Sequence, residues 1–158
     1  MELLRNGDME ALAAFTLERR GAVRHLLGRL WDADAEVRER AAEGIGVAAA
    51  QHPNLGLELL RRFDWALNDE SATNGAAVLG AMAAVAVRSP EISRPFVGRI
   101  VAALGDPGLR EPASRAVDRL EAQCPELLEP HRGELIDERP AGDAKDEARE
   151  RGGRWDEN

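Results

Sequence analysis

The turn Asn68-Asp69-Glu70-Ser71 gathers side chains that could do chemistry. Its two carboxylates and its hydroxyl could bind a cation or the guanidinium group of a partner's arginine, and Asn74 follows shortly after. The same residues also suit a simpler role, because they can end one helix and cap the next. The sequence leaves both hypotheses open.

Two tryptophans, Trp31 and Trp65, stand at nearly equivalent places in two similar segments of the chain. Tryptophan is favoured at the centres of protein interfaces, so an aromatic pair at one rim of the fold could anchor a partner peptide. Packing of each ring against its own turn is the alternative. The third tryptophan, Trp155, lies among charged residues near the C-terminus, where a short docking motif is one hypothesis.

The pattern of the remaining reactive residue types does not indicate a catalytic, cofactor or metal site. The three histidines, His25, His52 and His131, are scattered, and none has a partner at the i,i+4 spacing of a metal-binding helix. Cys124 directly precedes a proline at a predicted turn, which favours a small buried side chain over a reactive thiol. The glycines at 44–46 lie among alanines and not after a strand, so they predict tight packing and no phosphate-binding loop.

An internal repeat predicts the elements that position these residues. Three segments of the chain align at one spacing of 37 residues, and in each copy a leucine is followed two positions later by an aspartate. Two anchors that share one interval over three copies indicate a true structural repeat. The anchors are Leu30, Leu67, Leu104, Asp32, Asp69 and Asp106.

A proline opens the segment downstream of each copy, at Pro53, Pro90 and Pro125. Proline is tolerated in the first turn of a helix and rejected from helix interiors, so each one marks a helix start and each repeat contains two helices. Asp34 stands directly before one predicted helix, where its carboxylate can cap unpaired backbone N–H groups. The predicted helices span residues 8–19, 21–31, 35–51, 53–68, 71–88, 90–104, 107–123 and 125–137.

The segment LWDADAEVRERAAEGIG resembles a HEAT repeat in its leucine, the aspartate of its turn, its Val37-Arg38 pair and its small residues. The later copies are more degenerate, since Gly75 stands where Arg38 would be. WALNDES, the alanine-rich stretch after it, SPEI and CPELLEP are similar to a group of small bacterial HEAT-like proteins of unassigned biochemical function. The resemblance covers about residues 20–137 and implies an all-α fold, a short right-handed α-solenoid of about four stacked helical hairpins in an armadillo-like superhelix.

Two regions of different character divide the chain. Residues 1–137 are expected to form the HEAT-like helical repeat domain. Residues 138–158 are highly charged, contain three glycines and have little to bury apart from Trp155. We expect this C-terminal segment to be a disordered tail.

The second helix of each pair lines the concave side of a HEAT-like stack, so the resemblance makes the charges of the segment 35–51 candidates for the edge of a binding surface. A solvated face with weak i,i+4 pairs is the alternative. The segment 72–87 carries no charge and belongs to the central unit, where burial is expected and an exposed apolar groove is the other hypothesis. The predicted partner-binding residues are Trp31, Glu36, Glu39, Arg40, Glu43, Trp65, Asn68, Asp69, Glu70, Ser71 and Asn74.

The composition restricts the class of partner and the location. With 29 acidic against 21 basic residues the formal net charge is -8, which repels phosphate backbones and disfavours nucleic acid as the partner. One cysteine cannot form an internal disulfide, which is typical of a protein of the reducing cytoplasm. The N-terminal residues lack the apolar core of a signal peptide, and the uncharged run is shorter than the roughly 20 residues of a membrane span.

These observations predict a non-catalytic protein–protein interaction module or assembly scaffold in the cytoplasm, with another protein as its partner. The resemblance also implies an alternative, because HEAT-like repeats occur in lyase subunits that attach bilin chromophores to phycobiliproteins. A third hypothesis, an alkylated-base repair protein of HEAT-like fold, needs a basic concave face. The net charge disfavours it.

Overall fold

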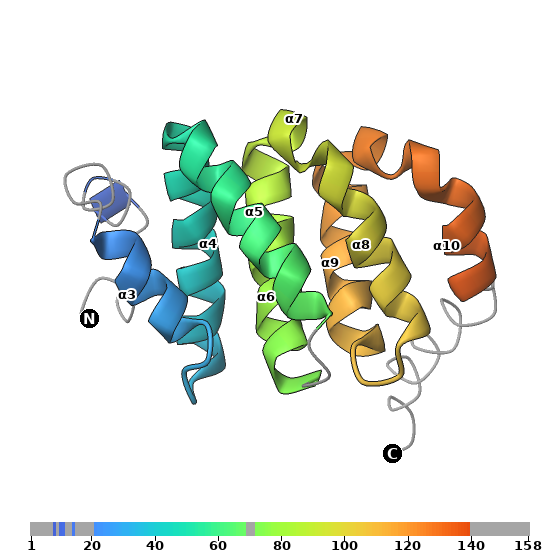
Figure 1. Ribbon diagram of the computed structural model, residues 1–158, viewed down its shortest axis with the longest axis horizontal. Coiled ribbons are helices and arrows are strands. Elements are labelled where there is room, and N and C mark those ends of the chain that lie inside the picture. Colours follow the sequence, from blue (N-terminus) through green and yellow to red (C-terminus); the bar gives the residue numbers. More distant parts are fainter. Residues whose placement is uncertain (1–7, 9, 12–13, 15–20, 69–71, 140–158) are drawn as a thin grey trace, which may run out of the picture.

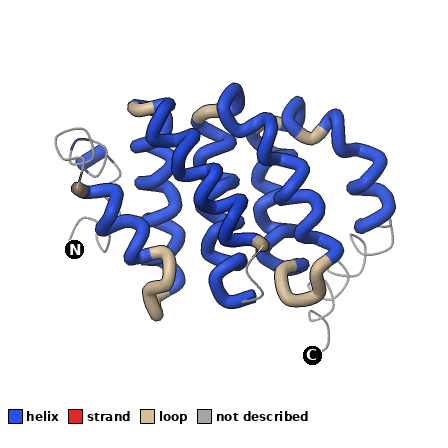
Figure 2. Tube along the Cα trace, in the orientation of Figure 1, coloured by secondary structure: helices blue, strands red, loops and turns tan. Residues whose placement is uncertain are grey.

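The computed structural model describes residues 8, 10–11, 14, 21–68 and 72–139, and every regular element within them is helical, which confirms the all-α prediction. Short loops join the helices (Figure 2). The predicted helix 8–19 lies mostly outside the described residues, and residues 140–158 of the predicted tail lie wholly outside them. The longer helices are α3 (Ala22–Arg29), α4 (Ala35–Gln51), α5 (Pro53–Leu67), α6 (Ala72–Arg88), α8 (Val97–Ala102), α9 (Arg110–Gln123) and α10 (Arg132–Glu138). The short elements are α7 (Pro90–Ser93) and the 3₁₀ turns η1 (Arg94–Phe96), η2 (Ala103–Gly105), η3 (Pro125–Leu127) and η4 (Glu129–His131).

The helices are arranged in two layers (Figure 1). Helices α4, α6 and α9 lie side by side in one layer, and α3, α5 and α8 cover one face of it. Helix α6 packs against both α4 and α9, so it is the central helix of its layer. Most of the uncharged run of the sequence therefore lies where it can contact helices on both sides.

The apolar core lies between the two layers. Among the leucines of the repeat, Leu30 and Leu104 are each 1% exposed, whereas Leu67 is only half-buried. Between 78 and 86 on α6, every residue except Gly80 is buried. The uncharged run is thus largely core, as expected. The largest fully buried side chains are Leu30, Ile45, Leu60, Leu79, Met82, Ile100, Leu104, Leu120, Leu127, Leu128, Val78 and Val85.

Two helices predicted to be continuous, 90–104 and 125–137, are broken in the structure. Each contains a second proline five residues after the first, Pro95 and Pro130. Proline has no N–H to donate and its ring clashes with the preceding turn, so the chain passes through the 3₁₀ turns η1 and η4 before α8 and α10 begin. Helix α5 starts at Pro53, has no second proline, and runs unbroken for 15 residues.

Aspartates at two of the predicted helix starts have different roles. Asp34 caps α4, because its backbone is extended and its Oδ1 accepts a hydrogen bond from the backbone N–H of Glu36 at 2.9 Å. Asp106 instead closes a turn, where its Oδ1 accepts from the backbone N–H of Gly108 at 2.8 Å. Helix α9 therefore begins at Arg110, later than the sequence predicts.

Replacing Asp34 with alanine should lower the free energy of unfolding by about 1 kcal/mol, because the first turn of α4 loses its side-chain acceptor. Urea denaturation followed by circular dichroism measures the change. Asp34→Asn keeps an acceptor oxygen and should cost no more than about 0.3 kcal/mol. Equal losses in both variants would show that the charge of Asp34, and not its capping hydrogen bond, stabilises this turn.

Glycines allow unusually close contact between neighbouring helices. A Cβ at Gly46 on α4 would lie 2.5 Å from the carbonyl oxygen of Ala84 on α6, closer than such atoms can approach. A Cβ at Gly56 on α5 would lie 2.9 Å from the Cβ of Ala49 on α4. The first contact fits the structural interpretation of the glycines at 44–46, because it draws the backbones of α4 and α6 together.

Candidate binding groove

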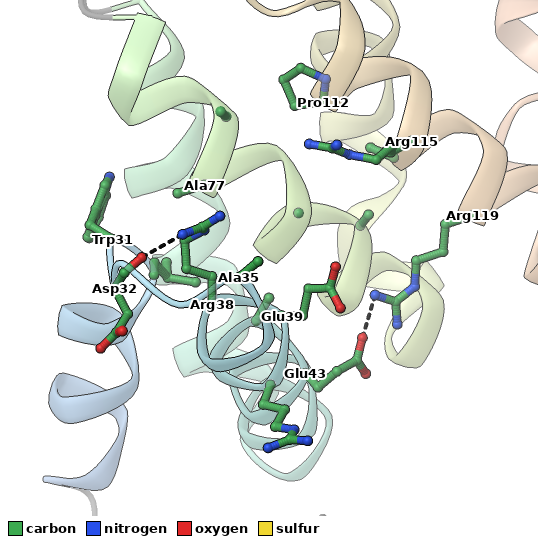
Figure 3. A pocket seen from close by; sticks show the side chains of 17 residues that line it. Trp31, Asp32, Ala35, Arg38, Glu39, Glu43, Ala77, Pro112, Arg115 and Arg119 are labelled. Atoms are coloured by element: carbon green, nitrogen blue, oxygen red, sulfur yellow. Dashed lines mark hydrogen bonds and ion pairs between the residues drawn. The ribbon is translucent and has the colours of Figure 1, made fainter. Parts of the chain in front are cut away.

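An open groove of about 800 Å³ lies on the face of the α4, α6 and α9 layer that α5 and α8 do not cover. It follows the N-terminal parts of the three helices, and the loop between α3 and α4 borders it (Figure 3). The lining residues are Leu30, Trp31, Asp32, Ala35, Arg38, Glu39, Arg40, Ala42, Glu43, Ala76, Ala77, Gly80, Ala83, Pro112, Arg115, Ala116 and Arg119.

The floor of the groove is a stripe of small residues on α6, namely Ala76, Ala77, Gly80 and Ala83. Their spacing places them on one face of the helix. Gly80 is exposed, Ala76 and Ala77 are half-buried and Ala83 is buried, so the part of this face that is open to solvent carries no charge. Both hypotheses for the uncharged run, burial and an exposed apolar groove, therefore apply to different parts of it. Most of the run is core, and one stripe forms the apolar floor of the groove.

The repeat register relates this floor to the charged face of α4. A shift of 37 residues carries Glu39 onto Ala76 and Glu43 onto Gly80. Helix α4 thus presents charged side chains at positions where α6 presents a methyl group or a hydrogen atom. The groove consequently has a charged wall beside an apolar floor.

Two side chains of opposite charge, Glu39 and Arg115, stand on the two walls of the groove (Figure 3). On the α4 wall, the carboxylate of Glu39 lines the groove and has no ion pair with any described residue. On the α9 wall, Arg115 lines the groove, and its Nη1 lies 2.8 Å from Oε1 of Glu111 on the same helix. Glu36 is not a lining residue, and its carboxylate pairs with Nη2 of Arg40 at 3.2 Å.

Glu43 links all three helices at one end of the groove. Its Oε2 accepts from Nη1 of Arg88 on α6 at 2.6 Å, and its Oε1 accepts from Nη1 of Arg119 on α9 (Figure 3). Partial burial raises the pKa of Glu43, but hydrogen bonds and positive charge from Arg119 and Arg88 outweigh burial, so the pKa is lowered overall. Glu43 is ionised at neutral pH and serves mainly to hold the layer together.

Trp31 contributes the one aromatic ring among the described residues that line the groove, and the residue is 47% exposed. The loop that carries it is held by Arg38, whose Nη1 donates to the carbonyl oxygens of Asp32 at 2.6 Å and Ala33 at 3.0 Å. Oδ1 of Asp32 also accepts from the backbone N–H of Asp34 at 3.1 Å. These hydrogen bonds fix the loop to the start of α4 and so position the tryptophan beside the groove.

The structure brings four of the predicted partner-binding residues together and separates the others. Trp31, Glu39, Arg40 and Glu43 all line the groove. Trp65 lies on α5, is 77% exposed and is not a lining residue, so the two tryptophans do not share one surface of the groove. Outside the described residues lie Asp69, Glu70, Ser71 and the side chain of Asn74.

Asn68 is occupied by the chain itself. Its side-chain oxygen accepts from Nη2 of Arg99, and the Nε of the same guanidinium donates to Oδ1 of Asp64 at 2.6 Å. The side-chain nitrogen of Asn68 donates to the carbonyl oxygen of Asp64 at 3.4 Å, at the end of α5. For Asn68, the arginine expected from a partner is therefore supplied by α8, and the contact ties α5 to α8.

The sequence did not predict the groove residues of α9, among them Pro112, Arg115 and Arg119. The third copy of the repeat carries charges of both signs, as α4 does, but its more degenerate motif drew no attention to them. A signal was nevertheless available, because a shift of 36 residues carries Ala76 onto Pro112 and Ala83 onto Arg119. The groove residues of α6 and α9 are thus related by 36 residues, one fewer than the 37 that separate the leucine and aspartate anchors of the same two copies.

The described residues contain no group of three histidine, cysteine or acidic side chains that could hold a metal ion. Cys124 is 3% exposed, and burial together with the charge of Glu126 raises the pKa of its thiol, which disfavours a reactive thiolate. Nδ1 of His131 lies 3.3 Å from Oε1 of Glu134, in an ordinary surface contact. These residues do not join the groove.

Comparison with known proteins found no matching family model, and no curated protein or solved structure was significantly similar to the chain. Among the helices that the structure describes, none is both long enough and apolar enough to cross a membrane.

Proposed function

We propose that this protein is a non-catalytic protein-binding module, built as a short right-handed α-solenoid of HEAT-like repeats, and that its partner occupies the groove of α4, α6 and α9. The observation that carries the proposal is the floor of α6, which is uncharged yet accessible to solvent. An apolar centre with a charged rim is the usual composition of a protein interface. The alternation of covering and groove-lining helices and the 37-residue register support the repeat assignment.

The side chains of the groove favour binding over catalysis. None of the described lining residues is a serine, threonine, cysteine, histidine or lysine, so these residues offer no hydroxyl, thiol, imidazole or amine nucleophile. Four arginines and three carboxylates line it, and one pair of them, Glu43 with Arg119, is satisfied internally. This mixture also differs from the uniformly basic surface that binding to a phosphate backbone requires. Helical repeat stacks generally supply extended binding surfaces of this kind.

The experiment is affinity capture from an extract of cells of the source organism. The wild-type protein and the Gly80→Leu variant serve as baits, and the proteins that each retains are compared. A Cβ at Gly80 would meet no atom within 4 Å, so leucine should fill the groove without disturbing the core. We expect one stoichiometric partner, retained by the wild type and at least about tenfold depleted with Gly80→Leu. Trp65→Ala, which changes an exposed residue outside the groove, is the matched control and should retain the partner.

The same experiment can contradict the proposal. Equal capture of one partner by the wild type and by Gly80→Leu would exclude the groove as its binding site. A version of the chain that ends at Arg139 adds a test of the predicted tail, because loss of the partner on truncation would move the site there.

The alternative of an enzyme subunit has a separate test. The groove volume lies within the range of about 300–1,000 Å³ that is usual for small-molecule sites. Incubation with a free bilin, followed by gel filtration and absorbance spectroscopy, would detect a bound or transferred chromophore. Co-elution of the chromophore with the protein would contradict a function limited to protein binding.

A further inference from the structure

Gly80 lies in the middle of α6, where packing within the chain does not require a glycine. It is exposed, and a Cβ at this position would meet no atom within 4 Å. Gly46 is the opposite case, since its missing Cβ allows the contact between α4 and α6. Glycine is a poor helix former, so its presence at 80 weakens α6 without a packing gain. What the glycine does preserve is free space directly above the helix backbone.

The residues around Gly80 extend this low floor along the helix. Ala76, Ala77 and Ala83 raise only methyl groups, so another backbone can approach α6 at the short end of the usual interhelical distance of about 8–10 Å. Helices α4 and α9 flank α6 on its two sides. A helix with its side chains is about 10–12 Å across, and the space above the middle one of three neighbouring helices suits that shape.

The groove lacks the structural features that other modes of peptide recognition require. An extended peptide that adds to a sheet needs an open strand edge, and the described residues contain no strand. A polyproline segment docks between several aromatic rings, whereas Trp31 is the single aromatic residue among the described residues that line the groove. A helix needs only an apolar groove with spaced anchors, which the stripe on α6 provides.

The charges beside the floor indicate which charge each flank of the bound partner carries. Glu39 on the α4 wall has no ion pair with a described residue, and its neighbour Arg40 is engaged by Glu36 at 3.2 Å. Arg115 on the α9 wall holds only a weak contact with Glu111 one turn away, in which both side chains are highly exposed, 69% and 81%. The two walls therefore favour a positive charge on one flank of the occupant and a negative charge on the other.

We propose that the groove receives a single α-helix of a partner protein, which crosses α6 at Gly80 and presents a basic side chain to Glu39 and an acidic side chain to Arg115. This proposal rests on the proposed function and adds the form and chemistry of the partner. The helix has a small or apolar stripe toward α6. Its two flanks carry opposite charges.

The probe is a yeast-displayed library of helices of about 18 residues, five turns, with a fixed alanine and leucine stripe and flanks that vary among lysine, glutamate and alanine. Selection uses the full-length chain. We expect enriched sequences to carry lysine on one flank and glutamate on the other. A fluorescent synthetic copy of the best sequence should bind with a Kd in the micromolar range in an anisotropy titration.

Three variants of the chain then test the geometry with that peptide. Gly80→Leu should weaken binding at least about tenfold, and Glu39→Lys and Arg115→Glu about fivefold each. The double reversal Glu39→Lys with Arg115→Glu should prefer a peptide with its lysines and glutamates exchanged. Trp65→Ala should bind as the wild type does, and thermal unfolding should show that Gly80→Leu remains folded.

Several results would overturn the helix proposal. These are the absence of enriched sequences, enrichment without a charge pattern, undiminished binding to Gly80→Leu, or a double reversal with unchanged preference. The outcome is separable from the proposed function. If a cellular partner is lost with Gly80→Leu but charge exchange has no effect on the peptide, the groove still binds a protein and only the helix proposal fails.

Discussion

Gly46→Ala should lower the free energy of unfolding by about 2 kcal/mol, whereas Gly80→Ala should raise it by about 0.5–1 kcal/mol. Both substitutions add one methyl group to a helix of the same layer, and both gain helix propensity. They differ in what the new Cβ meets. At Gly46 it would lie 2.5 Å from the carbonyl oxygen and 2.9 Å from the carbonyl carbon of Ala84, and at Gly80 it meets nothing within 4 Å.

The conflict at Gly46 cannot be relieved by a rotamer change, because its two closest contacts are backbone atoms of α6. The helices must move apart, and the surrounding core loses contacts. Trimming the neighbour with Ala84→Gly should therefore fail to rescue Gly46→Ala. Urea titrations of the two single variants and of the double variant measure these effects, with an unchanged m-value as the check that the unfolded state is comparable. Similar stabilities for the two alanine variants would refute the close approach of α4 and α6.

Glu43→Gln should lower the free energy of unfolding by about 1–3 kcal/mol at neutral pH. The carboxylate accepts from Arg88 and Arg119, and all three side chains are less than a third exposed. A neutral amide leaves two guanidinium groups near each other without a counter-charge. Glu39→Gln on the same helix is the matched control, and because that carboxylate has no ion pair with a described residue, it should change stability by less than about 0.5 kcal/mol.

The pH dependence gives a second readout for Glu43. Its pKa in the folded protein is lowered from the ordinary value of 4.5, so the unfolded chain takes up the proton first as the solution is acidified. The stabilisation is therefore complete above about pH 4.5 and is lost as the pH falls through the lower, folded-state pKa. The difference in stability between the wild type and Glu43→Gln should shrink over that acidic range. A difference independent of pH would assign the loss to packing instead of charge.

The helices of this protein could be predicted closely because their signals are local. The predicted helix 35–51 matches α4. Its start is set by Asp34, whose side chain caps a backbone N–H only two residues away. The helices starting at Pro90 and Pro125 were predicted too long, although the sequence contained the reason. Their second prolines remove a donor and clash with the previous turn, which is also a local effect.

The candidate site was only partly predictable, because its walls come from segments far apart in the chain. Glu39 and Arg115 belong to helices separated by two full repeats, and only packing places them on either side of α6. The same holds for Asn68, whose hydrogen-bond partner Arg99 lies 31 residues away. A charge pattern along one helix predicts which residues face solvent, but it does not show what the next helix presents to them.

The all-α fold and the starts of several helices, among them α4 and α5, could be predicted from the sequence alone. The roles of residues that look alike in sequence depend on the tertiary structure. Gly46 and Gly80 both lie in alanine-rich helices. The backbone of α6 occupies the space where a Cβ of Gly46 would stand, whereas the same space at Gly80 is empty. Glu39 and Glu43 are one turn apart, yet only the second is held by two arginines. Helix formation depends on residues within a few positions, whereas the space and charge around a side chain are set by whichever distant segment packs beside it.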